Sequence, residues 1–129
     1  MLSSSASLVD DRLDGCTAAE LAERLALPRV VLLASCPSTL DVAHRLAGEG
    51  ADAGTLVIAD AQTAGRGRLG RQWSSEAGGG LWLTLVERRI DDHALRVLSL
   101  RAGLLVAEAL DPLTDDRVGV KWPNDLLIG

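Results

Sequence analysis

Arginines and glycines alternate in one short segment of the chain, Gln62 to Trp73 (QTAGRGRLGRQW). Its cations Arg66, Arg68 and Arg71 stand close together in an otherwise acidic protein. Guanidinium groups bind carboxylates and phosphates through paired hydrogen bonds, and glycines let the backbone approach the same anion. The segment therefore predicts an anion-binding loop, and the alternative is a solvated basic loop without a ligand.

The glycines of this segment also match the G-x-G-x-x-G pattern of dinucleotide-binding turns, and a strand-like run precedes them. A dinucleotide-binding turn needs a helix directly after the glycines, because the helix amides face the pyrophosphate. Here Arg71 to Ser75 follow, and then the three glycines Gly78 to Gly80. That composition does not favour a helix, so the context argues against a dinucleotide site.

Two further segments could contribute polar groups. The motif Lys121-Trp122-Pro123-Asn124-Asp125 places a lysine at a strand end and an amide after a rigid proline turn. Taken alone, it fits an ordinary turn around a packed tryptophan equally well. Ser38-Thr39 begins a predicted helix, where amides and hydroxyls can bind polar ligands. Ser38 is also a good N-cap, and that structural role alone would account for it.

The hydrophobic pattern predicts the elements that must position these motifs. The glycine-rich residues 62–80 are expected to form a long loop, which in a compact domain is usually functional. Residues 65–80 are expected to be the least ordered internal segment without ligand. A stripe at spacings of three and four predicts the buried face of the third helix: Leu95, Leu98, Ala102, Leu105 and Ala109. Strands are predicted over 29–35, 55–61, 81–86, 118–121 and 126–128, and helices over 17–27, 38–48 and from Asp91 or Asp92 to 110.

Composition narrows the class of protein. The chain has 129 residues, a formal net charge of −5, and aromatic residues at only 2%, so the core is expected to be aliphatic. The acidic balance argues against broad nucleic-acid binding, which needs clustered cations. No apolar run reaches the roughly 18 residues of a membrane-spanning helix, and the N-terminus lacks a basic secretory signal. Cys16 and Cys36 are interpreted as free thiols, which favours a cytoplasmic location.

Together and in this order, the three motifs resemble those of the biotin–protein ligase family, the biotin–[acetyl-CoA-carboxylase] ligases. That family has a Ser-Thr pair, a Gln-x-x-Gly-Arg-Gly-Arg-x-Gly-Arg-x-Trp loop and a Lys-Trp-Pro-Asn-Asp motif. The resemblance covers about residues 30–129. It implies an α+β fold, with helices packed on a mixed sheet, similar to class II aminoacyl-tRNA synthetases. It also implies ATP-dependent activation of biotin to biotinyl-AMP with Mg²⁺, and transfer of biotin to a lysine of a biotin carboxyl carrier protein.

The resemblance assigns expected roles to residues of this chain, although it assigns none of them as a direct metal ligand. The catalytic residues would be Arg66, Arg68 and Lys121, and Asn124 would help to place the metal ion. The adenylate would be bound by Arg68, Trp73, Lys121 and Asn124. Biotin would be bound by Ser38, Thr39, Gln62, Gly65, Arg66 and Arg68.

The chain departs from the family pattern in two ways. Leu40 follows Ser38-Thr39 where many members have asparagine. Residues 1–29 are expected to be a tail and a short helix, too short for a winged-helix DNA-binding domain. Residues 30–129 are expected to be a partial catalytic domain whose C-terminal part, with a further lysine, is missing. The alternatives are therefore an inactive truncated fragment or partial ligand-binding module, and a lipoate–protein ligase. The oligomeric state stays open.

Overall fold

The computed structural model describes residues 11–129, so the expected N-terminal tail lies largely outside the described residues. The chain forms two compact units, Met1–Arg88 and Arg89–Gly129. Within the described residues, no helix is long and apolar enough to cross a membrane.

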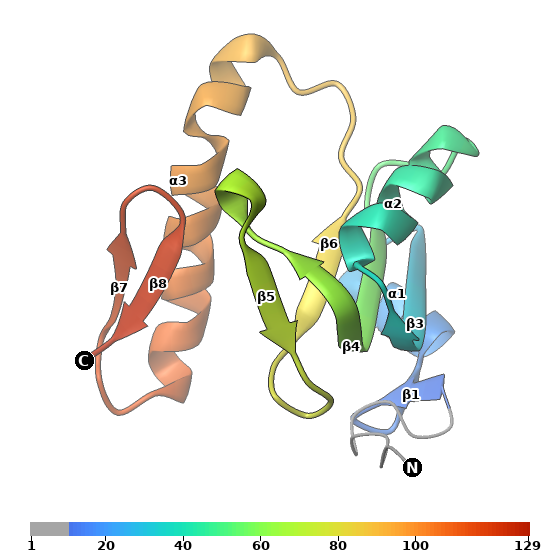
Figure 1. The fold of residues 1–129 in the computed structure, drawn as a ribbon, viewed down its shortest axis with the longest axis horizontal. Coiled ribbons are helices and arrows are strands. Elements are labelled where there is room, and N and C mark those ends of the chain that lie inside the picture. The colour runs from blue at the N-terminus through green and yellow to red at the C-terminus, as the bar shows by residue number, and fades with distance from the viewer. Residues whose placement is uncertain (1–10) are drawn as a thin grey trace. The chain divides into compact units, whose positions relative to one another are not determined.

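The first unit is built on a four-stranded mixed sheet (Figure 1). Its strands are β3 (Arg29–Cys36), β4 (Thr55–Arg66), β5 (Gln72–Ser75) and β6 (Trp82–Leu85). β3 pairs with β4 in parallel, while β5 and β6 pair with β4 antiparallel. β4 is long enough for β6 and β5 to pair with successive parts of it. The mixed sheet with packed helices confirms the predicted fold class.

Two helices cover the faces of this sheet. Side chains of β4 alternate between the faces, so Val57 packs with Ala43 and Leu46 of α2 (Thr39–Gly48). Leu56 and Ile58 point to the other face, where residues of α1 (Ala18–Leu25) pack. Both predicted helices are confirmed, and burial on both faces explains why β4 begins with a continuous apolar run.

α1 starts with a capping box, which the spacing of Thr17 and Glu20 in the sequence also indicates. The Glu20 amide donates to Thr17 Oγ1 at 3.2 Å, and the Thr17 amide donates to Glu20 Oε2 at 2.7 Å. These bonds satisfy amides that lack intrahelical partners. A small hairpin of β1 (Arg12–Leu13) and β2 (Cys16–Thr17), which was not predicted, precedes the helix.

The prediction of a structureless loop over residues 62–80 is wrong for its first part. β4 continues to Arg66, a 3-10 turn follows over Arg68–Gly70, and β5 returns along β4. Gly65 pairs with Trp73, and Arg66 pairs with Gln72. The register of this pairing shifts between Gln62 and Gly65. The antiparallel partner satisfies the backbone here, so a segment rich in glycine and arginine forms strands despite its low β-propensity.

The second unit is one helix and one hairpin. α3 (Asp92–Leu110) begins after Asp91, whose carboxylate accepts from the Ala94 amide at 2.7 Å. A 3-10 turn over Asp111–Leu113 leads to β7 (Val118–Lys121) and β8 (Asp125–Ile128), which pair antiparallel. The predicted helix and hairpin are both confirmed.

The predicted buried stripe of α3 is wrong. Leu95, Leu98 and Leu105 are 57%, 43% and 64% exposed, and Ala102 and Ala109 are exposed too. The buried residue is Ala107, and four residues earlier the site of a Cβ on Gly103 is 3.5 Å from Val120. The hairpin packs on this small-residue face because the backbones can approach closely there, which the leucine periodicity does not reveal.

Candidate ligand-binding site

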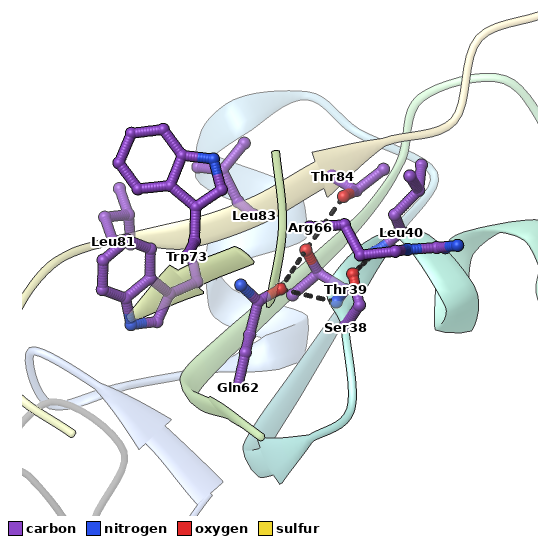
Figure 2. A pocket seen from close by; sticks show the side chains of 10 residues that line it. Ser38, Thr39, Leu40, Gln62, Arg66, Trp73, Leu81, Leu83 and Thr84 are labelled. Carbon is purple, nitrogen blue, oxygen red and sulfur yellow. Dashed lines mark hydrogen bonds between the residues drawn. The ribbon is translucent and has the colours of Figure 1, made fainter. Parts of the chain in front are cut away.

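A pocket of about 320 Å³ lies in the first unit. The start of α2, the end of β4, and β5 and β6 contribute its walls, so segments distant in sequence meet there (Figure 2). Figure 2 shows Trp73, Leu81 and Leu83 on one side of the pocket, and the polar side chains together with Leu40 on the other. The lining residues are Ser38, Thr39, Leu40, Gln62, Arg66, Trp73, Leu81, Trp82, Leu83 and Thr84.

A hydrogen-bond network fixes the polar side of the pocket (Figure 2). Gln62 Oε1 accepts from the Thr39 amide at 2.8 Å and from Thr39 Oγ1 at 3.1 Å. Thr39 Oγ1 also lies 2.9 Å from Thr84 Oγ1, and Gln62 Nε2 donates to Ser75 Oγ at 3.0 Å. Thr39 and Ser75 are buried, so the network joins α2, β4, β5 and β6 in a low-dielectric setting.

Ser38 has the structural role that the sequence suggested. It is the N-cap of α2, is buried, and its Oγ accepts from the Leu40 amide at 3.3 Å. A hydroxyl that accepts one bond can still donate its own hydrogen. N-capping therefore leaves Ser38 able to donate to a ligand in the pocket.

Gly65 lies where side chains of the network converge. A Cβ at this position would lie 2.8 Å from Ser75 Oγ, 2.9 Å from Gln62 Nε2 and 3.0 Å from the Trp73 carbonyl oxygen. Real Cβ atoms do not approach this closely, so any larger residue would displace the groups that hold Gln62. Because Gly65 has no side chain, Gln62 and Ser75 have room to form their hydrogen bond.

The arginines of the glycine–arginine segment differ in their position relative to the pocket. Arg66, the last residue of β4, lines the pocket and forms an ion pair with Asp41 in the first turn of α2. Arg68 begins the 3-10 turn and is outside the residues that line the pocket. Trp73 is 58% exposed and lies at the wall, with its indole nitrogen close to Gly67.

Lys121 and Asn124 belong to the second unit, whereas the lining of the pocket comes wholly from the first. Lys121 ends β7 and pairs in register with Asp125. Asn124 stands in the turn of the hairpin, and its Nδ2 donates to Asp125 Oδ1 at 3.5 Å. The turn thus groups the lysine, the amide and the carboxylate of the KWPND motif.

Several residues of the pocket were not predicted from the sequence. Trp82 and Thr84 alternate with Leu83 and Leu85 along β6, and this period of two could have identified them as one face of a strand. Asp41 carries no such signal, because only folding brings it to Arg66. Among residues 11–129, Trp82 Nε1 is a buried polar atom without a hydrogen-bond partner.

Cys36 ends β3 just before the pocket. Its thiol is buried and unpaired, as expected, and Cys16 is also free. Burial raises the pKa of the Cys36 thiol, and the nearby Asp41 carboxylate raises it further. The raised pKa favours the protonated form of the thiol, which is a poor nucleophile. The other side chains around the site are suited to binding a ligand.

Solved structures share this fold. A biotin protein ligase from Leishmania major in complex with biotinyl-5-AMP matches 78% of this chain and 47% of its own, with a TM-score of 0.67 and 30% identity. A biotin protein ligase from Aquifex aeolicus in complex with biotin and ATP matches 77% of this chain and 41% of its own, with a TM-score of 0.66 and 38% identity. The fold is therefore that of biotin protein ligases.

The sequence comparisons agree. The Biotin/lipoate A/B protein ligase family matches residues 32–129, and the chain belongs to this family. The bifunctional ligase/repressor BirA of Bacillus spizizenii is 44% identical over 92 residues, which are 70% of this chain and 28% of the relative. The biotin–[acetyl-CoA-carboxylase] ligase of Mycobacterium tuberculosis is 44% identical over 87 residues, 63% of this chain and 33% of the relative. The chain thus spans about a third or less of these relatives.

Proposed function

We propose that this chain contributes to a biotin–protein ligase, which activates biotin with ATP and transfers it to a lysine of a biotin carboxyl carrier protein. The observation that carries the proposal is the convergence of Thr39, Gln62 and Arg66 from three segments on one pocket. Residues 30–129 would carry the N-terminal part of the catalytic domain. ATP-dependent chemistry and free thiols favour the cytoplasm as its location.

The pocket has the chemistry that biotin would need. Biotin has a polar ureido ring, an apolar fused ring and chain, and a terminal carboxylate. Ser38 and Gln62 would bind the ureido group, and the leucines and Trp82 of the pocket would cover the apolar part. Arg66 would receive the carboxylate, because a guanidinium pairs with it through charge-assisted hydrogen bonds.

The first step would join two anions. An oxygen of the biotin carboxylate attacks the α-phosphorus of ATP, the bond to the bridging oxygen breaks, and pyrophosphate leaves. Arg66, Arg68 and Lys121 would reduce the repulsion and stabilise the charge that develops, while Trp73 would stack near the adenine. Lys121 and Asn124 would contact the phosphates, as the family resemblance implies.

Mg²⁺ would accompany ATP in this step. Such ions keep water and phosphate ligands and take only one or two ligands from the protein. The amide oxygen of Asn124, grouped with the Asp125 carboxylate, has the hard donor chemistry that Mg²⁺ prefers.

The second step would need no nucleophile from this chain. The deprotonated lysine amine of the carrier protein attacks the acyl carbon of biotinyl-AMP, an amide forms, and AMP leaves. The role of the chain is to bind and orient the adenylate and to keep water from it.

Lipoate is the competing substrate, because the matching family includes lipoate ligases. The relative from Mycobacterium tuberculosis and the matched structures are named for biotin, which favours biotin. Calorimetry of the purified chain should give tighter binding of biotin than of lipoate. Tighter binding of lipoate, or no binding of either ligand, would contradict the proposal.

The other alternative is that this polypeptide alone binds ligand without turning it over. Biotin-dependent exchange between ATP and labelled pyrophosphate separates the two cases, because it reports adenylate formation directly. Exchange by the purified chain would show that it is an active enzyme. Biotin binding without exchange would instead identify a ligand-binding module of the ligase.

A further inference from the structure

Arg66 is the sole charged side chain among the residues that line the pocket of the first unit. An anionic ligand in this pocket would therefore depend on its guanidinium. In the structure, Arg66 Nη2 donates to Asp41 Oδ1. Figure 2 shows the Arg66 side chain extending away from Gln62 toward Leu40, along the start of α2. The guanidinium is thus directed to a carboxylate of the chain itself.

The start of α2 offers an anion little besides Arg66, because its amides are already occupied. The Thr39 amide donates to Gln62 Oε1, and the Leu40 amide donates to Ser38 Oγ. The Asp41 and Val42 amides donate to the Ser38 carbonyl oxygen. The guanidinium has further N–H donors, but the cation that a carboxylate would meet in the pocket is already paired with Asp41. The two carboxylates therefore compete for the same positive charge.

We propose that Asp41 is a positioning residue that holds Arg66 until an anionic ligand replaces it, and so sets how strongly the pocket prefers anionic over neutral ligands. This inference rests on the proposed function. The Arg66 and Asp41 side chains are 51% and 50% exposed, and ion pairs at such exposure are weak enough to exchange. Exchange replaces one carboxylate on Arg66 with another. The remaining Asp41 charge then opposes the bound anion.

The test compares two ligands that differ in charge. Asp41→Asn removes the competing carboxylate, so biotin should bind about two- to five-fold more tightly, the range that exposed ion pairs allow. Biotin amide has the same rings and no charge, so its affinity should not change. The gain for biotin should shrink as salt is added, because exposed charges are screened. Calorimetry on the full chain measures all three.

A matched control removes the same charge from the opposite end of the same helix. Glu49 pairs with Arg45 at 3.8 Å, and neither lines the pocket. Glu49→Gln should leave the affinities for biotin and biotin amide unchanged. In an Arg66→Gln background, Asp41→Asn should no longer tighten biotin binding, because the guanidinium for which it competes is absent.

Three outcomes would overturn the inference. Weaker biotin binding by Asp41→Asn would mean that Asp41 organises Arg66 for the ligand. Equal effects on biotin and biotin amide would mean a change of packing, and an unchanged biotin affinity would mean no competition. In each case the wild-type chain still binds biotin, so the proposed function stands. A wild-type chain that binds no biotin would instead contradict the proposed function, and the inference with it.

Discussion

The two units use helices in opposite ways. In the first unit, α2 covers the sheet with Ala43 and Leu46, both nearly fully buried. In the second unit, α3 approaches its hairpin at Gly103 and buries Ala107, while its leucines are exposed. In α2 the apolar residues Val42, Ala43, Leu46 and Ala47 lie on one face by helical periodicity, and they pack in the core. In α3 the periodicity indicated the wrong face. A stripe of leucines predicts a face that can be buried, but the shape of the partner decides which face is used.

The two units also differ in how they support the candidate functional residues. The pocket is held by a network that spans one helix and three strands, so its polar groups are fixed relative to each other. The KWPND residues stand in a hairpin supported by one helix. The same kind of substitution should therefore have unequal effects in the two units.

The largest contrast is expected for leucine truncation. Leu46→Ala in α2 should destabilise the first unit by about 2–5 kcal/mol, because it leaves a cavity in a packed core. Leu98→Ala in α3, which removes the same atoms from an exposed position, should cost no more than about 0.5 kcal/mol. Urea unfolding followed by tryptophan fluorescence measures both. Equal losses would show that the leucine face of α3 is covered, and would remove the contrast between the units.

A smaller contrast is expected for glycine substitution in strands. Gly65→Ala should cost about 1–3 kcal/mol and weaken biotin binding, because the new methyl group forces Ser75 and Gln62 apart. Gly119→Ala in β7 is the matched control, since its Cβ would meet only the Leu127 carbonyl oxygen, at 4.0 Å. We expect little change from it. Unaltered biotin affinity in Gly65→Ala would show that the position of Gln62 does not matter for the ligand.

The smallest effect is a dependence on alkaline pH confined to the first unit, which holds both cysteines. Burial raises the pKa of Cys36 in the folded protein, so the unfolded chain loses its thiol proton first as pH rises. Stability should therefore be unaffected below the ordinary thiol pKa and fall between that value and the raised one. Unfolding midpoints across this window should lose the slope in Cys36→Ala. A slope that persists in this variant would have another origin.

The elements of the fold were largely readable in the sequence. The capping box at Thr17, the alternation in β6 and the apolar run of β4 each reflect local physical constraints. α1 and β6 formed as predicted, and the apolar run predicted the first part of β4. The strand character of residues 62–75 was not readable, because their composition is unfavourable for strands and the pairing of β4 with β5 compensates for it.

Some residues of the candidate site were likewise predicted from the sequence, and others were revealed only by the structure. Ser38, Thr39, Gln62, Arg66 and Trp73 were named from motifs, and the structure brings them to one pocket. Asp41 and Ser75 were not named, because nothing in their local pattern distinguishes them from ordinary helix or strand residues. Trp82 and Thr84 were not named either, although the alternation along β6 places them on one face of the strand. Their importance comes from contacts with residues distant in sequence.

The sequence by itself determined the family, the three α-helices, five of the eight strands and the residues able to bind an anion, because motifs, periodicity and caps are local properties of the chain. Only the tertiary structure decided which face of α3 is used and which partner Arg66 takes. The first outcome depends on the close approach of α3 and the hairpin at Gly103. The second depends on the contact between Arg66 and Asp41, which are 25 residues apart in the sequence. Long-range proximity of this kind is created by packing and leaves no periodic trace in the sequence.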